Sequence, residues 1–155
     1  MHYFLKDVPE RTQKPREKGF TMAMDKGLSV REAEDFMSVA SEYVDIVKLG
    51  WATSYVTPNL NEKLDIYRQA NIPFYFGGTL FEAFIARNQF DDYRKLLDKY
   101  QVPFAEVSDG SLEMDHDEKC EYIKELKGQV TVLSEVGSKD EEKIIPPYKW
   151  IELMQ

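Results

Sequence analysis

The sequence contains very little cysteine and histidine. Among its 155 residues there are one cysteine, Cys120, and two histidines, His2 and His116. A zinc site built from thiolates and imidazoles needs several such residues at short spacing, and an internal disulfide needs a second thiol, so the sequence excludes both. The lack of disulfides fits a reducing compartment. Cys120 stands at helical spacing in DEKCEYIKEL, which favours an ordinary helix residue over a nucleophile.

Long apolar runs and excess positive charge are also missing. No stretch approaches the roughly 18 apolar residues that a membrane span requires, and the N-terminal residues 1–19 are too polar for a signal peptide. We therefore expect a soluble, cytoplasmic protein without a membrane partner. A net charge of −8 argues against nucleic acid as a main partner. This net charge does not exclude a small anionic ligand, which a local group of lysines could bind.

The residues that are present supply one domain with a repeating pattern. Hydrophobic residues make up 43% of the chain, which is enough for an ordinary core, and the apolar runs begin after a mostly polar segment at residues 1–18. Within residues 19–155, strand-like apolar runs alternate with amphipathic helical stretches; the runs fall at 20–24, 44–50, 72–78, 102–110 and 129–137. This alternation predicts an α/β fold with a parallel sheet. Five units fit either an open five-stranded sheet or the first part of a (β/α)8 barrel.

Polar residues and glycines gather at the C-terminal end of every expected strand, in the segments DKG, KLGW, GGT, EVSDGS and SEVGSK. In parallel α/β folds the functional site lies at that edge.

Lys48 shares a strand face with the apolar Ile46, so in a closed sheet its ammonium points along the interior. It is then an anion clamp or a proton donor of lowered pKa, unless it is a rim lysine in water. Lys26, in a loop, is the weaker candidate.

Gly77, Gly78 and Thr79 join the third expected strand to a helix. Glycines there let backbone amides approach a ligand, and a helix N-terminus favours an anion. Thr79 and Glu82 also have the spacing of a capping box, which satisfies the same amides internally. The two interpretations are equally supported and can coexist.

Carboxylates end the fourth and fifth expected strands. Neighbouring parallel strands lie about 4.8 Å apart, so Glu106 and Glu135 are within reach of one another and suit Mg2+ with water in its remaining coordination positions. The alternative is a set of carboxylates that cap loops. Ser108 and Asp109 are candidate ligand contacts, but they are also good turn formers, and Asp109 fits a local cap.

Five segments in this order resemble the phosphosulfolactate synthase family: GFTMAMDKGL, VDIVKLGWATS, FYFGGTLFEAF, AEVSDGS and SEVGSK, from Gly19 to Lys139. The resemblance implies a (β/α)8 barrel of which this chain holds the first five β/α units. It also implies Mg2+-dependent addition of sulfite to phosphoenolpyruvate, an early step toward coenzyme M or sulfolactate. Glu106 and Glu135 are then the metal residues and Lys48, Lys26 and Lys139 the catalytic ones.

The chain departs from the family pattern after the fifth strand. Members of the family have Gly-Lys-Lys where this sequence has Gly137, Ser138 and Lys139, which leaves the general acid open; Ser138 becomes a candidate substrate contact. The later barrel strands are not in these 155 residues, so we expect an incomplete site and no activity from this chain alone. Two alternatives remain. One is a non-catalytic stress-associated or interaction protein of the same fold, and the other is an enolate-forming lyase with another nucleophile. A homo-oligomer also remains open.

Overall fold

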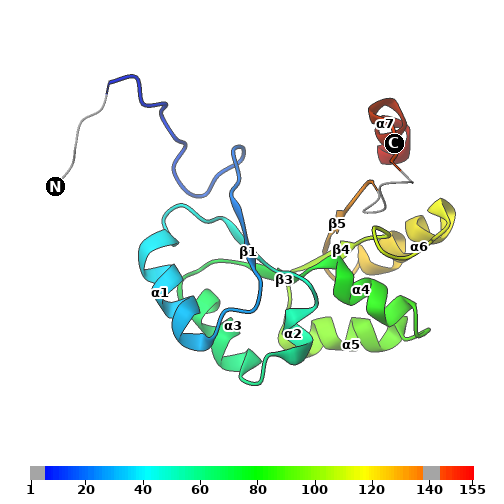
Figure 1. Ribbon diagram of the computed structural model, residues 1–155, viewed down its shortest axis with the longest axis horizontal. Helices are drawn as coiled ribbons and strands as arrows, with labels where there is room; N and C mark the ends of the chain where they lie inside the picture. Colours follow the sequence, from blue (N-terminus) through cyan, green and yellow to red (C-terminus); the bar gives the residue numbers. More distant parts are fainter. Residues whose placement is uncertain (1–5, 138–143) are drawn as a thin grey trace.

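The computed structural model describes residues 6–137 and 144–155, and strands and helices alternate along them as expected (Figure 1). The strands are β1 (Met22–Asp25), β2 (Ile46–Leu49), β3 (Phe74–Phe76), β4 (Phe104–Val107) and β5 (Thr131–Ser134). The helices are α1 (Val30–Ala40), α2 (Thr53–Val56), α3 (Leu60–Gln69), α4 (Gly78–Ile85), α5 (Phe90–Tyr100), α6 (His116–Leu126) and α7 (Pro147–Met154).

The sheet is parallel, and each strand pairs with the next one along the chain, in the order β1-β2-β3-β4-β5. A doubly wound open sheet reverses its strand order at a switch point. In a (β/α)8 barrel, by contrast, each strand lies beside the next one along the chain, and the helices form an outer layer. The fold is therefore a five-unit portion of such a barrel, which confirms the predicted architecture.

One face of the sheet packs against the helices and forms the core. The Phe74 ring lies 6.4 Å from the Tyr67 ring of α3, and the Phe76 ring lies 5.8 Å from the Tyr100 ring of α5, measured between centroids. Leu49 on the same face is fully buried. Because side chains alternate along a strand, Lys48, Tyr75 and Glu106 point to the opposite face, which we call the inner face.

The inner face is less completely covered in the described residues. Met22 and Met24 of β1 are 44% and 41% exposed, although both belong to the sheet. The continuous burial expected for a strand covered on both faces therefore does not hold for β1, whereas the three residues of β3 are all buried.

One expected helix is divided in two, and one short helix was not predicted. The residues between the apolar runs at 72–78 and 102–110 predict a single helix over 79–100, but a left-handed turn at Asn88 ends α4 and redirects the chain into α5. The short helix α2 precedes α3 in a stretch for which no helix was predicted. The three-residue spacing of Ser29 and Glu32 predicts a capping box at the start of α1, and both reciprocal hydrogen bonds are present. None of the helices in the described residues is long and apolar enough to cross a membrane.

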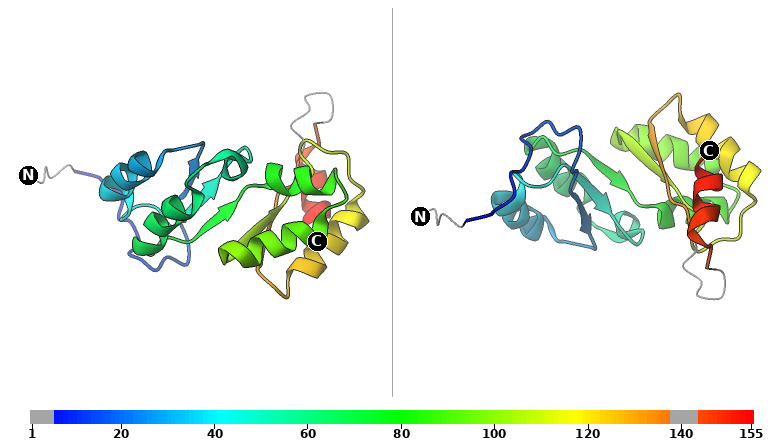
Figure 2. Two further views of the ribbon diagram at one scale, coloured as in Figure 1. Left: turned by 90° about the horizontal axis from the view of Figure 1, so that it is seen from below. Right: turned by 90° about the horizontal axis from the view of Figure 1, so that it is seen from above.

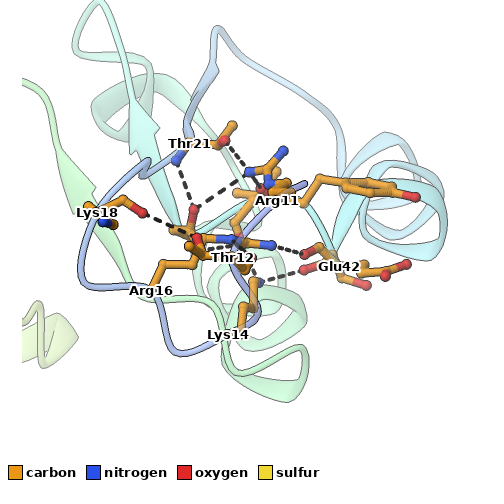
Figure 3. A network of polar contacts seen from close by, with 11 residues as sticks. Arg11, Thr12, Lys14, Arg16, Lys18, Thr21 and Glu42 are labelled. Atoms are coloured by element: carbon orange, nitrogen blue, oxygen red, sulfur yellow. Dashed lines mark hydrogen bonds and ion pairs between the residues drawn. The ribbon is translucent and has the colours of Figure 1, made fainter. Parts of the chain in front are cut away.

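Part of the polar N-terminal segment packs against the N-terminal edge of the sheet (Figure 3). Arg16 is buried and pairs with Asp45, just before β2, at 2.6 Å. The Lys14 ammonium and the guanidinium groups of Arg11 and Arg16 donate to backbone carbonyls of residues 41–44, after α1. Cations there complement the negative end of the helix dipole. In both views of Figure 2 the N-terminal segment lies toward one end of the molecule, and α6 and α7 lie toward the other.

Candidate active site

A pocket of about 300 Å³ opens at the C-terminal ends of the strands, the edge at which the site was predicted. Its lining contains four of the predicted site residues; the complete set is Met24, Lys26, Lys48, Gly50, Trp51, Thr79, Ser111 and Glu135. A larger depression of about 560 Å³ adjoins Gly128 and Gln129, just before β5. It therefore lies at the opposite edge of the sheet and is the poorer candidate.

Lys48 lies between two carboxylates beneath this pocket. Its ammonium is 2.7 Å from one oxygen of Glu106 and 3.2 Å from Glu135. Burial alone lowers the pKa of Lys48, but the hydrogen bonds and charges of Glu106 and Glu135 outweigh it and hold the pKa above its ordinary value. The idea of a proton donor of lowered pKa is therefore wrong, because two acids stabilise the charged form. The role of Lys48 as an anion clamp remains a prediction.

Glu106 is almost fully engaged by the protein. Besides Lys48, its carboxylate accepts a hydrogen bond from the backbone N–H of Gly78, and the Tyr75 hydroxyl lies at 3.5 Å. Burial and the Glu106 charge both raise the pKa of Tyr75, so this hydroxyl remains protonated. Glu106 acts here as the counter-ion that fixes Lys48.

The two glycines after β3 are required by close packing. A Cβ at Gly77 would lie 2.9 Å from Cε of Lys48, and one at Gly78 would lie 2.3 Å from Cβ of Ser108. Gly77 is the N-cap of α4, and no side chain caps this helix. The capping box of Thr79 and Glu82 is therefore wrong, since Glu82 turns into the protein instead. Thr79 lines the pocket, while the first amide of α4 already donates to a carboxylate.

Glu82 was not predicted as a site residue, yet it is buried beside the pocket. The hydroxyl of Ser108, at the end of β4, lies 2.5 Å from Glu82 and 2.9 Å from Glu135. The backbone N–H of Ser111 lies 3.4 Å from the same Glu82 oxygen. The available signal was a carboxylate inside the apolar run TLFEAF, where an exposed residue is unexpected. Ser108 thus joins α4 to the end of β5.

Asp109 does not line the pocket. Its carboxylate pairs with Lys119 of α6 at 2.8 Å, and Lys119, which is buried, also donates to the backbone carbonyl of Glu135. The N-cap of α6 is Asp115, so the local helix cap suggested for Asp109 is wrong. The pair fixes the β4 and β5 ends relative to α6.

A second group of buried polar side chains holds the loop after β1. Asp25 is 2% exposed and contacts the Lys63 ammonium and the Tyr67 hydroxyl, each at 2.9 Å. Its other oxygen accepts from the backbone N–H groups of Gly27 and Leu28. Burial raises the pKa of Tyr67, and the charge and hydrogen bond of Asp25 raise it further. The group fixes the loop that carries Lys26, and sequence reasoning missed it.

Lys26 extends over the indole ring of Trp51, with its ammonium 5.8 Å from the ring centroid. Both residues line the pocket. Ser138 and Lys139 lie outside the described residues, so their predicted roles remain predictions.

The described residues contain no cluster of three or more histidine, cysteine or acidic side chains that could hold a metal. Mg2+ does not require such a cluster, because it keeps several waters and often takes one or two carboxylates plus substrate oxygens. Glu135 fits this need best, since its side chain is 38% exposed and lines the pocket, whereas Glu106 is only 6% exposed.

Comparisons with known proteins identify the family of this chain. Residues 9–155 match the family model described as (2R)-phospho-3-sulfolactate synthase (ComA). Three curated relatives are named phosphosulfolactate synthase. The Bacillus subtilis protein is 39% identical, over 92% of this chain and 56% of its own length. The Methanothermobacter thermautotrophicus protein is 38% identical, over 88% of this chain and 54% of its own length. The Methanocaldococcus jannaschii protein is 37% identical, over 82% of this chain and 52% of its own length.

This chain thus spans about half the length of the curated relatives that it matches. The match includes β1 to β5 and the strand ends that form the pocket, which supports the resemblance first seen in five short segments. The chain belongs to the phosphosulfolactate synthase family.

Proposed function

We propose that this site belongs to a carbon-sulfur lyase that adds sulfite to phosphoenolpyruvate and forms (2R)-phospho-3-sulfolactate. The observation that carries the proposal is a lysine, held by two carboxylates, in a pocket at the strand ends. The names of the relatives support the same reaction.

The reaction makes one carbon-sulfur bond and consumes one proton. The sulfur lone pair of sulfite attacks the methylene carbon of phosphoenolpyruvate, and the electrons of the carbon-carbon double bond move into the carboxylate. This gives an aci-carboxylate with additional negative charge. A proton delivered to the carbon that bears the phosphate then completes the product. Stabilising the developing charge is the main demand on the protein.

Lys48 meets this demand by position and charge. Its raised pKa keeps it protonated throughout the neutral range, so it supplies a fixed positive charge and is a poor proton donor. Its side chain is 11% exposed, so water screens its attraction for a bound anion less than at a surface lysine, while Glu106 and Glu135 offset part of that attraction. Lys26 adds a second positive charge at the pocket.

The proton donor has to be another group. Lys139 remains the candidate because it follows the end of β5, where Glu135 reaches the pocket. Ser138 occupies the position at which the family has its first lysine, so a single lysine is available in this stretch for the role.

Mg2+ belongs to the proposal, with Glu135 as its principal protein ligand and water or substrate oxygens as the others. When bound, the ion would supply Lewis-acid stabilisation of the substrate carboxylate. Glu135→Gln should weaken Mg2+ binding, measured by calorimetry, and reduce turnover while leaving the fold intact by circular dichroism. Unchanged affinity for Mg2+ would show that Glu135 is not a ligand.

The role of Lys48 is tested by one variant that removes its positive charge and one that keeps it. Lys48→Met should lower kcat about 100- to 1,000-fold in the coupling of phosphoenolpyruvate to sulfite, followed by phosphorus NMR. Lys48→Arg should retain more activity, because it keeps the charge although its shape differs. Activity of Lys48→Met close to that of the unaltered protein would refute the charge-stabilising role. A melting temperature for each variant separates loss of folding from loss of chemistry.

A further inference from the structure

The turn after β2 holds two consecutive non-glycine residues in the left-handed region. Trp51 has φ 58° and Ala52 has φ 55°, a costly conformation for residues that carry a Cβ. The hydroxyl and the backbone N–H of Thr53 both donate to the carbonyl of Gly50, at 2.8 and 3.0 Å, and close this turn. The turn is therefore held in place by its neighbours.

Three other left-handed residues have a simpler explanation. Asn71, Asn88 and Gln101 follow the C-terminal ends of α3, α4 and α5, where a left-handed residue commonly ends a helix. Trp51 instead follows a strand and lies at the pocket. Strained backbone of this kind occurs preferentially at functional sites.

Burial does not explain the conformation of Trp51 either. Its side chain is 69% exposed, so the hydrophobic effect contributes little to holding it there. The conformation places Trp51 in the lining of the pocket, to which Lys26 and Lys48 also belong.

The indole ring has a charged partner. The Lys26 ammonium lies 5.8 Å from the ring centroid, within the range of a cation-π interaction. Lys26 follows Asp25, whose carboxylate is fixed by Lys63, Tyr67 and two backbone amides. Both partners are thus attached to rigid supports, one at the end of β1 and the other at the end of β2.

We propose that Trp51 is a substrate-positioning residue whose indole forms one wall of the pocket and holds the Lys26 ammonium toward a bound phosphorylated carboxylate. The inference rests on the proposed function for the identity of that anion, phosphoenolpyruvate. It adds a role for a residue that makes no chemical contribution of its own, and it explains why an exposed aromatic side chain occupies an unfavourable backbone conformation.

The first test separates stability from binding. Trp51→Gly should leave the melting temperature unchanged or raise it, because glycine adopts the left-handed conformation freely. Its dissociation constant for phosphoenolpyruvate, measured by calorimetry, should rise about three- to tenfold or more. The matched control is Gln101→Gly, which also removes the strain of a left-handed residue but lies at the end of α5. It should leave the dissociation constant for phosphoenolpyruvate unchanged. Unchanged binding by Trp51→Gly would overturn the proposal.

The second test asks whether Trp51 acts through Lys26. Trp51→Ala and Lys26→Met should each weaken phosphoenolpyruvate binding, and the double variant should lose less than the product of the two separate losses. Trp51→Phe should recover part of the affinity, because a smaller aromatic ring still faces the ammonium. Fully multiplicative losses would overturn the positioning role, since they would show two independent contacts.

Fluorescence supplies a readout that does not depend on turnover. Binding of phosphoenolpyruvate should change the tryptophan emission of the unaltered protein and of Trp150→Phe, but the change should be lost in Trp51→Phe. A response without sulfite coupling would support the inference and refute the proposed lyase. Coupling with no Trp51 response and normal binding by Trp51→Gly would refute the inference alone. Absence of phosphoenolpyruvate binding would refute both.

Discussion

At the scale of single residues, the site depends on contacts too close for any larger side chain. Gly78 lies against Ser108, and its backbone N–H donates to Glu106. Gly78→Ala should therefore lower the free energy of unfolding by about 1–3 kcal/mol, the usual cost of overpacking. The matched control is Gly128→Ala, because no atom lies within 4 Å of a Cβ there.

The measurement is urea unfolding of both variants. The control should remain within about 0.5 kcal/mol of the unaltered protein. Equal stability of the two variants would mean that the β3–α4 connection does not pass Ser108 as closely as described.

The predicted residues show what a local pattern can establish. Lys48, Glu106 and Glu135 were identified because each ends a strand, and parallel strands bring such ends together. Glu82 was assigned to a capping box because its spacing from Thr79 fits one. Only the position of Ser108, on another strand, determines which way Glu82 points. Likewise, the pKa of Lys48 is raised because Glu106 and Glu135, which are distant in the sequence, lie next to its ammonium in the fold.

At the scale of elements, the buried Asp25 ties β1 to α3. Burial alone raises the pKa of Asp25, but hydrogen bonds from Lys63, Tyr67 and two backbone amides outweigh it, and the pKa is lowered. The ionised carboxylate therefore stabilises the fold above its unfolded pKa of about 3.9. That stabilisation is lost as the pH falls through the lower, folded-state pKa.

Asp25→Asn should lower the free energy of unfolding by about 3–5 kcal/mol at pH 7, because it leaves the buried Lys63 without its ion-pair partner. The difference from the unaltered protein should shrink when the pH is reduced below about 4. Asp65→Asn is the matched control, since Asp65 forms an exposed pair with Arg68 worth at most about 1 kcal/mol. A pH-independent difference for Asp25→Asn would contradict the assigned ionised state.

Elements were predicted with uneven success for physical reasons. The strands and α1 followed from apolar runs and a complete capping box. The division between α4 and α5 was missed, because the left-handed turn at Asn88 interrupts a sequence of good helix formers. Lys63 was also missed, since a lysine in an amphipathic helix is normally exposed and only the buried Asp25 explains its position.

At the scale of the whole molecule, strand order determines the architecture. The alternation of strands and helices in the sequence fits both an open sheet and a barrel, and only the pairing of each strand with its successor identifies the barrel type. That pairing brings the ends of β1 to β5 to one edge, where the pocket opens. The pocket contains Lys26 and Lys48 although the chain has a net charge of −8, so the overall charge does not reveal the lysines placed at this edge.

The central claim is that this edge carries out sulfite addition, and product formation tests it most directly. Phosphoenolpyruvate and sulfite are incubated with the natural polypeptide at its full length, with and without Mg2+, and (2R)-phospho-3-sulfolactate is measured by mass spectrometry. The account predicts product that depends on the protein and on Mg2+ and that is strongly reduced in Lys48→Met. Absence of product from a folded protein that binds phosphoenolpyruvate and Mg2+ would contradict it.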